Sequence, residues 1–191
     1  MNIIIRLFDN DRFCFRPDTT WERENRDFFS PDFMSRIFFT PVIFARISRA
    51  GKCIGRKFAG RYYDASNFGM LMYNGDILEE NLPDSVAFAS MTDRTSILPF
   101  PLYNPEVMTN ENNGFRLSID GKCVFSCMSA EVADKIGNAV CKASEIISLR
   151  TGDMVAVELD APKEIISGGN SRICVEGRFC ENELFRFDIV R

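Results

Sequence analysis

Residues Ile37-Phe38-Phe39-Thr40-Pro41-Val42-Ile43-Phe44-Ala45-Arg46-Ile47 form the stretch that decides the fold class. Most of its side chains are β-branched or aromatic, and these residue types are enriched in β-strands. The turn residues Ala50-Gly51-Lys52 follow it. We therefore predict a strand over residues 37–47. Proline has no N–H for a neighbouring strand, so Pro41 predicts an edge, a bulge or the start of a strand.

Further strand patterns lie on both sides of this stretch. Residues 115–119 alternate apolar and polar side chains, and Asp120-Gly121 suits a type I′ turn. Residues 123–125 would return as the second strand of that hairpin. We expect the other strands at the start of the chain, residues 1–6, at 67–76 with a turn at Gly75-Asp76, and in a final pair at 172–180 and 184–190.

Helical patterns are fewer. Ser129 can cap a helix that has Glu131 in its first turn. Its apolar face would carry Val132, Ile136, Val140, Ala143 and Ile147. A short helix is expected over residues 58–63, and residues 79–113 are expected to be rich in loops. The sequence predicts a single β-rich α+β domain over residues 1–191, in which residues 1–35 form a shortened, irregular N-terminal part.

Composition excludes several kinds of partner. The chain has 191 residues, of which 46% are hydrophobic and 18 are Phe, enough for a substantial core. The net charge is −4, and basic residues are scattered among acidic ones, so we expect no nucleic-acid or anionic-membrane surface. The longest apolar runs fall far short of the roughly 20 residues of a membrane helix. Without the pattern of a signal peptide, a cytoplasmic location is the expectation.

Histidine is absent from the chain. This excludes Ser-His-Asp and Cys-His relays, histidine ligands for zinc, and the usual general base that titrates near neutral pH. Any catalysis would depend on carboxylates, Lys, Tyr, a Cys thiolate or a metal bound by carboxylates. The seven Cys residues have no regular spacing, which predicts reduced, mostly buried thiols. For Cys123 and Cys127, four residues apart, we prefer buried structural thiols to a redox or metal pair.

A series of short segments runs in one order along the chain. The first two are Phe15-Arg16-Pro17-Asp18-Thr19 and Phe29-Ser30-Pro31-Asp32-Phe33. The series continues with residues 46–54, residues 57–64 followed by Gly69 and Asp76, Asp93 with Leu98-Pro99, the hairpin at 119–124, and the helix exit at 143–153. In this order and spacing the segments resemble the motifs of the fumarylacetoacetate hydrolase family, in the form of its C-terminal catalytic domain. The resemblance implies a mixed β-sheet roll or sandwich with a few short helices.

The resemblance also implies where a metal site would lie. Enzymes of the family hold a divalent cation with a Glu-x-Glu pair on one strand and an Asp on the next. Three hard oxygen ligands leave open positions where Mg²⁺ can polarise the oxygens of a keto-acid. In this chain the two Glu positions correspond to Thr40 and Val42, and the Asp position corresponds to Leu71. The strands that carry them are therefore expected to be neighbours, without a bound cation.

Other family positions are also replaced. The Lys of the family falls on Ser90, although Asp93 is kept, and the Gly-Thr-Pro turn that contacts a substrate carboxylate falls near residues 158–160. Acidic groups there would repel an anion. The Asn-Tyr-x-x-His stretch is missing between Ile5 and Phe15. A relic pocket of Arg16, Asp18, Asp76, Ser90 and Asp93 is one reading, but we prefer turn caps or pairs with nearby Arg residues for Asp76 and Asp93.

Two functions follow from these replacements. The first is a non-catalytic, homodimeric binding or structural protein, degenerate in the family's metal-dependent chemistry, with no cofactor and an unknown small-molecule ligand. The alternative is a hydrolase, isomerase or decarboxylase that acts on a small keto-acid by an altered mechanism. The missing ligand set favours the first. The Phe-rich N-terminal part would mainly pack in the core, with a ligand pocket or a dimer face as alternatives. Its members are Phe8, Phe13, Phe15, Phe28, Phe29, Phe33, Phe38 and Phe39.

Overall fold

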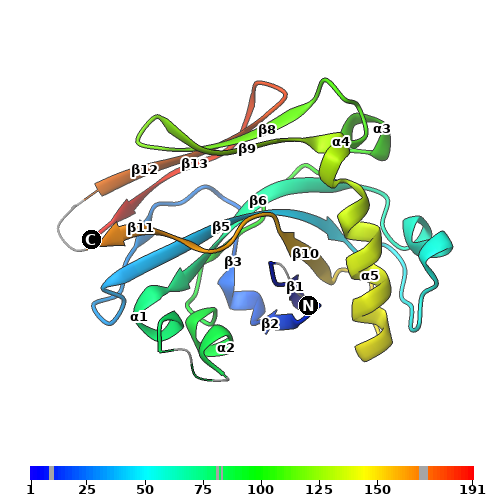
Figure 1. Ribbon diagram of the computed structural model, residues 1–191, viewed down its shortest axis with the longest axis horizontal. Helices are drawn as coiled ribbons and strands as arrows, with labels where there is room; N and C mark the ends of the chain where they lie inside the picture. The colour runs from blue at the N-terminus through cyan, green and yellow to red at the C-terminus, as the bar shows by residue number, and fades with distance from the viewer. Residues whose placement is uncertain (9–10, 81, 83, 168–171) are drawn as a thin grey trace.

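Two β-sheets dominate the computed structural model, which describes residues 1–8, 11–80, 82, 84–167 and 172–191 (Figure 1). Within these residues the larger sheet has eight strands in the order β2-β1-β10-β5-β6-β7-β3, and β11 also pairs with β5. It mixes parallel pairs such as β1–β10 with antiparallel pairs such as β5–β6. Its strands are β1 (Ile3–Arg6), β2 (Phe13–Arg16), β3 (Trp21–Glu22), β5 (Arg36–Arg46), β6 (Ser66–Asn74), β7 (Ser96–Ile97), β10 (Met154–Glu158) and β11 (Lys163–Ser167).

The smaller sheet lies over one face of the larger one (Figure 1). In the described part of the chain it has five strands in the order β4-β13-β12-β8-β9. Phe68 of the larger sheet stacks on Phe115 of the smaller sheet, with 4.6 Å between ring centroids. The strands are β4 (Phe28–Phe29), β8 (Gly114–Ile119), β9 (Lys122–Met128), β12 (Arg172–Phe179) and β13 (Asn182–Val190).

The helices are short and lie around the sheets. The longest, α5, packs against β10 and η2, whereas α1 and α2 lie on the side of the larger sheet away from the smaller one (Figure 1). Every helix in the described ranges is too short or too polar to traverse a bilayer. The helices are η1 (Asp18–Thr20), η2 (Arg56–Arg61), α1 (Gly75–Leu78), α2 (Ser85–Ala89), α3 (Pro105–Met108), α4 (Ser129–Val132) and α5 (Asp134–Ile146).

The predicted β-rich α+β class is confirmed, and so are the long strands and both hairpins. Asp120 and Gly121 have φ values of 48° and 75°, as a type I′ turn requires. Three local predictions are wrong. Residues 1–35 contain four short strands, Gly75-Asp76 begins α1 instead of forming a turn, and Ser129 is the first residue of α4, with no side-chain cap bond at that end.

Pro41 lies inside β5 and not at its edge or start. Its carbonyl accepts a hydrogen bond from Leu159 N–H at 2.9 Å, so its N–H-less nitrogen faces the same side. On that side β10 pairs with residues 42–46 and β11 pairs with residues 36–39. The two partner strands thus leave a gap in the ladder at Pro41, and the missing donor costs no strand-to-strand hydrogen bond there.

The larger sheet has two buried faces, because successive residues of a strand point to opposite sides. We call the side that packs on the smaller sheet the inner face; β5 contributes Phe39, Ile43 and Ala45 to it. We call the opposite side the outer face; β5 contributes Val42 and Phe44 to it. Both faces are buried, so the strand reads as a continuous apolar run and not as an alternating one.

Candidate functional site

The outer face brings together the three positions that we expected, from the resemblance, to correspond to metal ligands. Thr40 on β5 is the direct cross-strand partner of Leu71 on β6, and Val42 is the partner of Gly69. The expectation that these two strands are neighbours is confirmed. All three side chains have no exposed surface, and Val42 and Leu71 belong to one apolar cluster on this face. At Gly69, a Cβ atom would come within 2.3 Å of the Ile97 carbonyl oxygen, so glycine allows β7 to pair closely with β6.

These residues do not fit a divalent cation. The Thr40 hydroxyl donates to the Asp160 carbonyl at 2.6 Å, and the other two side chains are hydrocarbon. Mg²⁺ and Ca²⁺ require several oxygen ligands to replace their water. In the described ranges no group of three or more His, Cys, Asp or Glu side chains could hold a metal ion. The outer face therefore offers a cation no ligand set.

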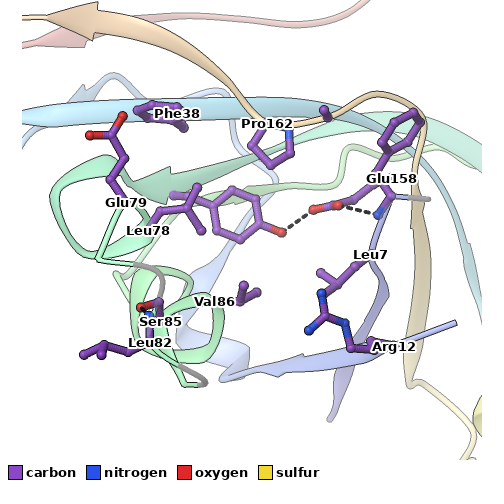
Figure 2. Close-up of a pocket in the computed structure, with 13 residues that line it drawn as sticks. Leu7, Arg12, Phe38, Leu78, Glu79, Leu82, Ser85, Val86, Glu158 and Pro162 are labelled. Carbon is purple, nitrogen blue, oxygen red and sulfur yellow. Dashed lines mark hydrogen bonds between the residues drawn. The ribbon is translucent and has the colours of Figure 1, made fainter. Parts of the chain in front are cut away.

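A cavity of about 550 Å³ opens beside this apolar cluster (Figure 2). Its volume lies within the range of small-molecule sites. The walls are mainly apolar and come from the β1 end, from β5 and from the α1–α2 region, whereas the polar groups are few. The described residues that line it are Leu7, Phe8, Arg12, Phe38, Tyr73, Leu78, Glu79, Leu82, Ser85, Val86, Glu158, Ala161 and Pro162.

A hydrogen-bonded pair of polar side chains lies at the cavity wall. Tyr73 is two residues after Leu71 on β6, and Glu158 is the cross-strand partner of Val42 at the end of β10, so both point from the outer face. The Tyr73 hydroxyl donates to one carboxylate oxygen of Glu158 (Figure 2). The other oxygen accepts the Phe8 N–H at 2.8 Å. Glu158 is 4% exposed and Tyr73 is 1% exposed, so the pair is part of the protein interior.

Arg16 completes this arrangement from behind the tyrosine. Its guanidinium carbon lies 4.3 Å from the centroid of the Tyr73 ring, and its nitrogens donate to the carbonyls of Met72 and Thr95 at 3.0 and 3.2 Å. Among the described residues no carboxylate lies within ion-pair distance of Arg16, which is 3% exposed. Glu158 is the acid that electrostatically opposes its charge across Tyr73.

Burial governs the acid–base properties of the pair. Removal from water raises the pKa of Glu158, and it outweighs the hydrogen bonds from Tyr73 and Phe8 and the charge of Arg16. Burial likewise raises the pKa of Tyr73 well above its usual range, and the neighbouring Glu158 acts in the same direction. Tyr73 therefore keeps its proton. Glu158 differs from the surface acids of the chain because burial raises its pKa.

None of the five residues of the predicted relic pocket lines this cavity. Arg16 reaches the site only through Tyr73. Ser90 is buried, and its hydroxyl donates to the Ala87 carbonyl at 2.8 Å. Asp93 is exposed, and Asp18 lies 3.9 Å from the N-terminal amine. A relic pocket formed by these residues stays a prediction.

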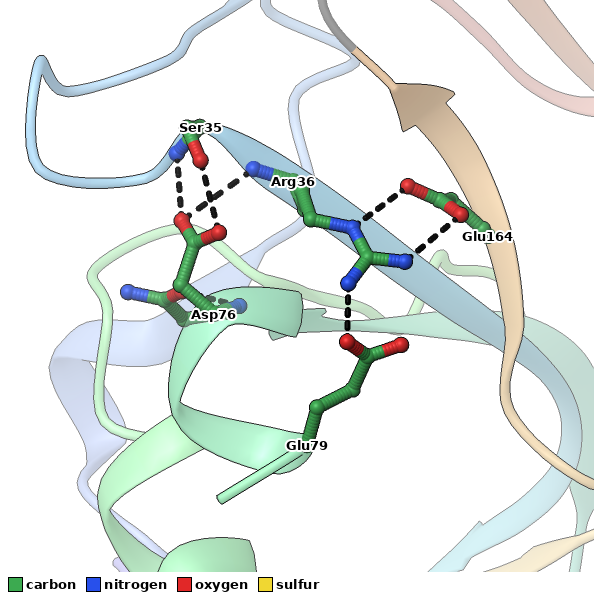
Figure 3. A network of polar contacts seen from close by, with 6 residues as sticks. Ser35, Arg36, Asp76, Glu79 and Glu164 are labelled. Atoms are coloured by element: carbon green, nitrogen blue, oxygen red, sulfur yellow. Dashed lines mark hydrogen bonds and ion pairs between the residues drawn. The ribbon is translucent and has the colours of Figure 1, made fainter.

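Asp76, in the first turn of α1, connects this helix to the start of β5 (Figure 3). Its carboxylate accepts the N–H and the hydroxyl of Ser35 at 2.7 and 2.6 Å, and the Arg36 N–H at 3.2 Å. Partial burial acts to raise the pKa of Asp76, but these bonds outweigh it and hold the pKa below its ordinary value. Arg36 in turn pairs with Glu79 and Glu164. For Asp76 we preferred a turn cap or a pair with a nearby Arg. Its carboxylate binds Ser35 and the Arg36 N–H at the start of β5, whereas the side chain that caps α1 is that of Asn74.

Residues 158–160, where we expected acids that would repel an anion, also make structural contacts. Glu158 is a buried hydrogen-bond acceptor, and Asp160 pairs with Lys163 while its carbonyl holds Thr40. Sequence reasoning did not single out Tyr73. The signal that was present is a lone Tyr in an otherwise apolar strand, Phe68-Gly69-Met70-Leu71-Met72-Tyr73. A buried tyrosine hydroxyl requires a partner.

The cysteine and phenylalanine predictions are partly wrong. All seven Cys are free, but only Cys14 and Cys141 are buried, and Cys123 is exposed. Burial, with a smaller contribution from Glu131, raises the pKa of Cys127 to about 12, so this thiol is not a nucleophile at neutral pH. Of the Phe-rich part, Phe8 and Phe38 line the cavity, whereas Phe29 and Phe33 are 67% and 68% exposed.

Several solved structures have a fold similar to that of this chain. A protein from Yersinia pestis assigned to the fumarylacetoacetate hydrolase family matches with a TM-score of 0.80 at 11% identity, over 99% of this chain and 92% of the other. The 2-hydroxyhepta-2,4-diene-1,7-dioate isomerase from Mycobacterium marinum matches with 0.81 at 15% identity, over 100% and 74%. Fumarylpyruvate hydrolase from Pseudomonas aeruginosa, solved with Mn²⁺ and pyruvate, matches with 0.71 at 16% identity, over 99% and 96%.

No family model matches the sequence, and no curated protein is significantly similar to it. The predicted fumarylacetoacetate hydrolase-like fold is thus confirmed by structure. At 11–16% identity the likeness concerns the fold.

Proposed function

We propose that this chain is a non-catalytic protein with a fumarylacetoacetate hydrolase-like fold, which binds a small molecule in the cavity of the outer face. One observation carries the proposal. Thr40, Val42 and Leu71 lie together with no exposed surface, in an apolar part of that face. On this proposal they occupy the place of a metal-ligand set and leave it without anionic oxygens.

On this proposal, apolar side chains have replaced the carboxylates of a metal site and now pack as part of the core. Carboxylates held close together without a metal repel one another and lose hydration, which raises their pKa values and destabilises the fold. Val42 and Leu71 replace that cost with apolar burial, worth roughly 1.5–3 kcal/mol for each enclosed side chain. The cavity beside them retains the size of a small-molecule site without the means to polarise a keto-acid.

The test combines metal binding with turnover. The protein, purified without chelator, is titrated with Mg²⁺ and Mn²⁺ by calorimetry and assayed with acylpyruvates in their presence. We expect no stoichiometric binding and no turnover above background, because the outer face lacks a ligand set. The Pseudomonas aeruginosa fumarylpyruvate hydrolase is the positive control. Metal-dependent turnover by this chain would refute the proposal.

A second candidate is an enzyme that acts on a small keto-acid by an altered mechanism, as a hydrolase, isomerase or decarboxylase. The Tyr73–Glu158 pair favours it, because a buried carboxyl of raised pKa beside a cavity has the character of a general acid or base. Metal-independent turnover that Glu158→Gln abolishes would establish this candidate. Turnover that survives Glu158→Gln would exclude the pair as its catalytic group.

We further propose a homodimer. Phe29 and Phe33, on and next to β4, expose most of their surface, and a partner subunit would remove this apolar area from water. Sedimentation should give a mass twice that of the chain, and Phe29→Ser with Phe33→Ser should give the monomer. A monomeric parent protein would refute this part of the proposal.

A further inference from the structure

We propose that the cavity beside Tyr73 and Glu158 selects an uncharged ligand with a compact apolar body and one hydrogen-bond-donating group, such as a hydroxyl or an amide N–H. This inference rests on the proposed function and specifies the ligand class of the same site. It differs from the acids named in the relatives, fumarylpyruvate and a heptadienedioate.

The walls define the body of the ligand. Leu7, Phe38, Leu78, Val86 and Pro162 present hydrocarbon to the cavity (Figure 2). An apolar surface of this kind gains free energy by covering an apolar ligand and gains none from a charged one. A volume of about 550 Å³ accepts a body of one or two rings.

The polar pair defines the head group, because both of its members present acceptors. The Tyr73 hydroxyl has a single proton and donates it to Glu158, which leaves the phenol oxygen as an acceptor. Each Glu158 oxygen already accepts one bond, from Tyr73 or from Phe8 N–H, and keeps a second lone pair. A ligand that reaches the pair therefore has to bring a donor.

Charge balance favours an uncharged donor over an amine. The buried guanidinium of Arg16 needs an opposing charge, and Glu158 supplies it across the Tyr73 ring when it is ionised. The pair and Arg16 together are then neutral, and Glu79, another acid in the lining, already pairs with Arg36. An ammonium group would therefore lose its hydration without gaining an unpaired counter-charge. A carboxylate ligand has no proton to donate and would lie against Glu158. Arg12, which also lines the cavity, is the group that would favour an anion, so a carboxylate is the decisive competitor.

Four probes that share one ring test this selection. They are cyclohexylmethanol, its methyl ether, cyclohexanecarboxylate and cyclohexylmethylammonium, each titrated into the ¹⁵N-labelled protein and followed by two-dimensional NMR. We expect the alcohol to shift the amides of the cavity residues and to bind at least about tenfold more tightly than each of the others, since its hydrogen bond ends on a charged acceptor.

Three variants locate the effect. Glu158→Gln should remove most of the preference for the alcohol over the ether, and Val86→Phe, which fills the cavity, should abolish binding of every probe. Glu176→Gln is the matched control, because this glutamate pairs with Arg178 on the smaller sheet, and it should change no affinity. The spectra report the fold of each variant directly.

Each other outcome overturns the inference. Tighter binding of the carboxylate or the ammonium would assign the cavity to a charged ligand, and absence of binding by all four probes would show that the site selects none of this class. An alcohol preference unchanged in Glu158→Gln would place the donor elsewhere. These results leave the proposed loss of metal-dependent catalysis standing, whereas metal-dependent turnover would refute that proposal whichever probe binds.

Discussion

The two faces of the larger sheet are built from the same strands but differ in what they bury. The inner face packs apolar side chains against the smaller sheet, and Phe68 of β6 stacks on Phe115 of β8. The outer face is also apolar at Val42 and Leu71, yet it contains the buried Arg16 and the Tyr73–Glu158 pair and borders a cavity. One face encloses only core, and the other encloses core plus a small polar group with a defined hydrogen-bond pattern.

The comparison suggests that the inner face mainly stabilises the fold, whereas the outer face also imposes specific hydrogen-bond partners. A packed apolar face stabilises a fold without requiring a particular chemistry, whereas every polar atom on the outer face needs a partner. Arg16 meets this requirement only in part. Its two terminal nitrogens donate four hydrogen bonds, but its Nε has no partner among the described residues. The following substitutions test whether the faces are as distinct as this comparison claims.

The largest effect is expected from restoring acids on the outer face, with Val42→Glu and Leu71→Asp together. Two carboxylates would be buried without a cation, on a face whose buried base, Arg16, already opposes Glu158. Each uncompensated buried charge costs on the order of 3–5 kcal/mol. The thermal midpoint, measured in chelator, should fall sharply, and added Mg²⁺ should not produce turnover. If the double variant were as stable as the parent, the outer face would be an open site and not core.

The next largest effect is expected on the inner face from Phe115→Ala. Phe115 is 1% exposed and stacks on Phe68, so its truncation leaves a void between the two sheets. We expect a loss of about 3–5 kcal/mol in the free energy of unfolding, measured with denaturant. Probe binding in the outer cavity should change little in the folded fraction. A loss of binding as large as the loss of stability would mean that the faces are coupled.

A smaller and pH-dependent effect is expected from Glu158→Gln, about 1–3 kcal/mol at neutral pH. Burial raises the folded-state pKa of Glu158 above 4.5, so the folded protein holds this proton more tightly than the unfolded chain. The parent should therefore lose stability relative to Glu158→Gln as pH rises from about 4.5 through the raised pKa. Unfolding titrations across this range measure the slope.

Glu22 provides the opposite sign for comparison. Burial acts to raise its pKa, but the Glu24 N–H and Arg94 outweigh it and lower the pKa below 4.5. Its contribution to stability is present above that value and is lost as pH falls through the lowered pKa. Equal slopes for Glu22→Gln and Glu158→Gln would contradict the assignment of a buried, raised-pKa carboxyl to the outer face.

The smallest effect is expected from Glu164→Gln at the surface network of Figure 3. Glu164 pairs with Arg36, which keeps Glu79 as a second partner, and exposed ion pairs contribute little because water and salt screen them. We expect no resolvable change in the thermal midpoint at high salt. A large change would show that this network, and not only the two faces, determines stability.

How much of this could be read from the sequence depended on the length of the pattern. β5, β6 and the two hairpins have runs of β-branched, aromatic or alternating residues, and these predictions succeeded. β3, β4 and β7 have only two residues each and carry no such pattern. Of the expectations for Pro41, the edge and the strand start were wrong, because the gap between β10 and β11 is set by pairing partners more than 100 residues away in the chain.

The site was harder to predict from the sequence than the fold. The positions of Thr40, Val42 and Leu71 came from family spacing, and the adjacency of their strands is confirmed by the structure. The Tyr73–Glu158 bond joins residues 85 positions apart, and no local pattern encodes such a pair. The register of β5 against both β6 and β10 brings the two side chains together.

The gap at Pro41 has a consequence for engineering this scaffold. The chain between β10 and β11 leaves the sheet there, while the Asp160 carbonyl stays bonded to the Thr40 hydroxyl and Leu159 stays bonded to the Pro41 carbonyl. An insertion between residues 160 and 162 would lengthen a segment whose two ends are already anchored by separate strands, and longer connections add little to the entropy of closure. Because Ala161 and Pro162 line the cavity, we expect such an insertion to alter the cavity wall without shifting the register of β10 or β11 against β5.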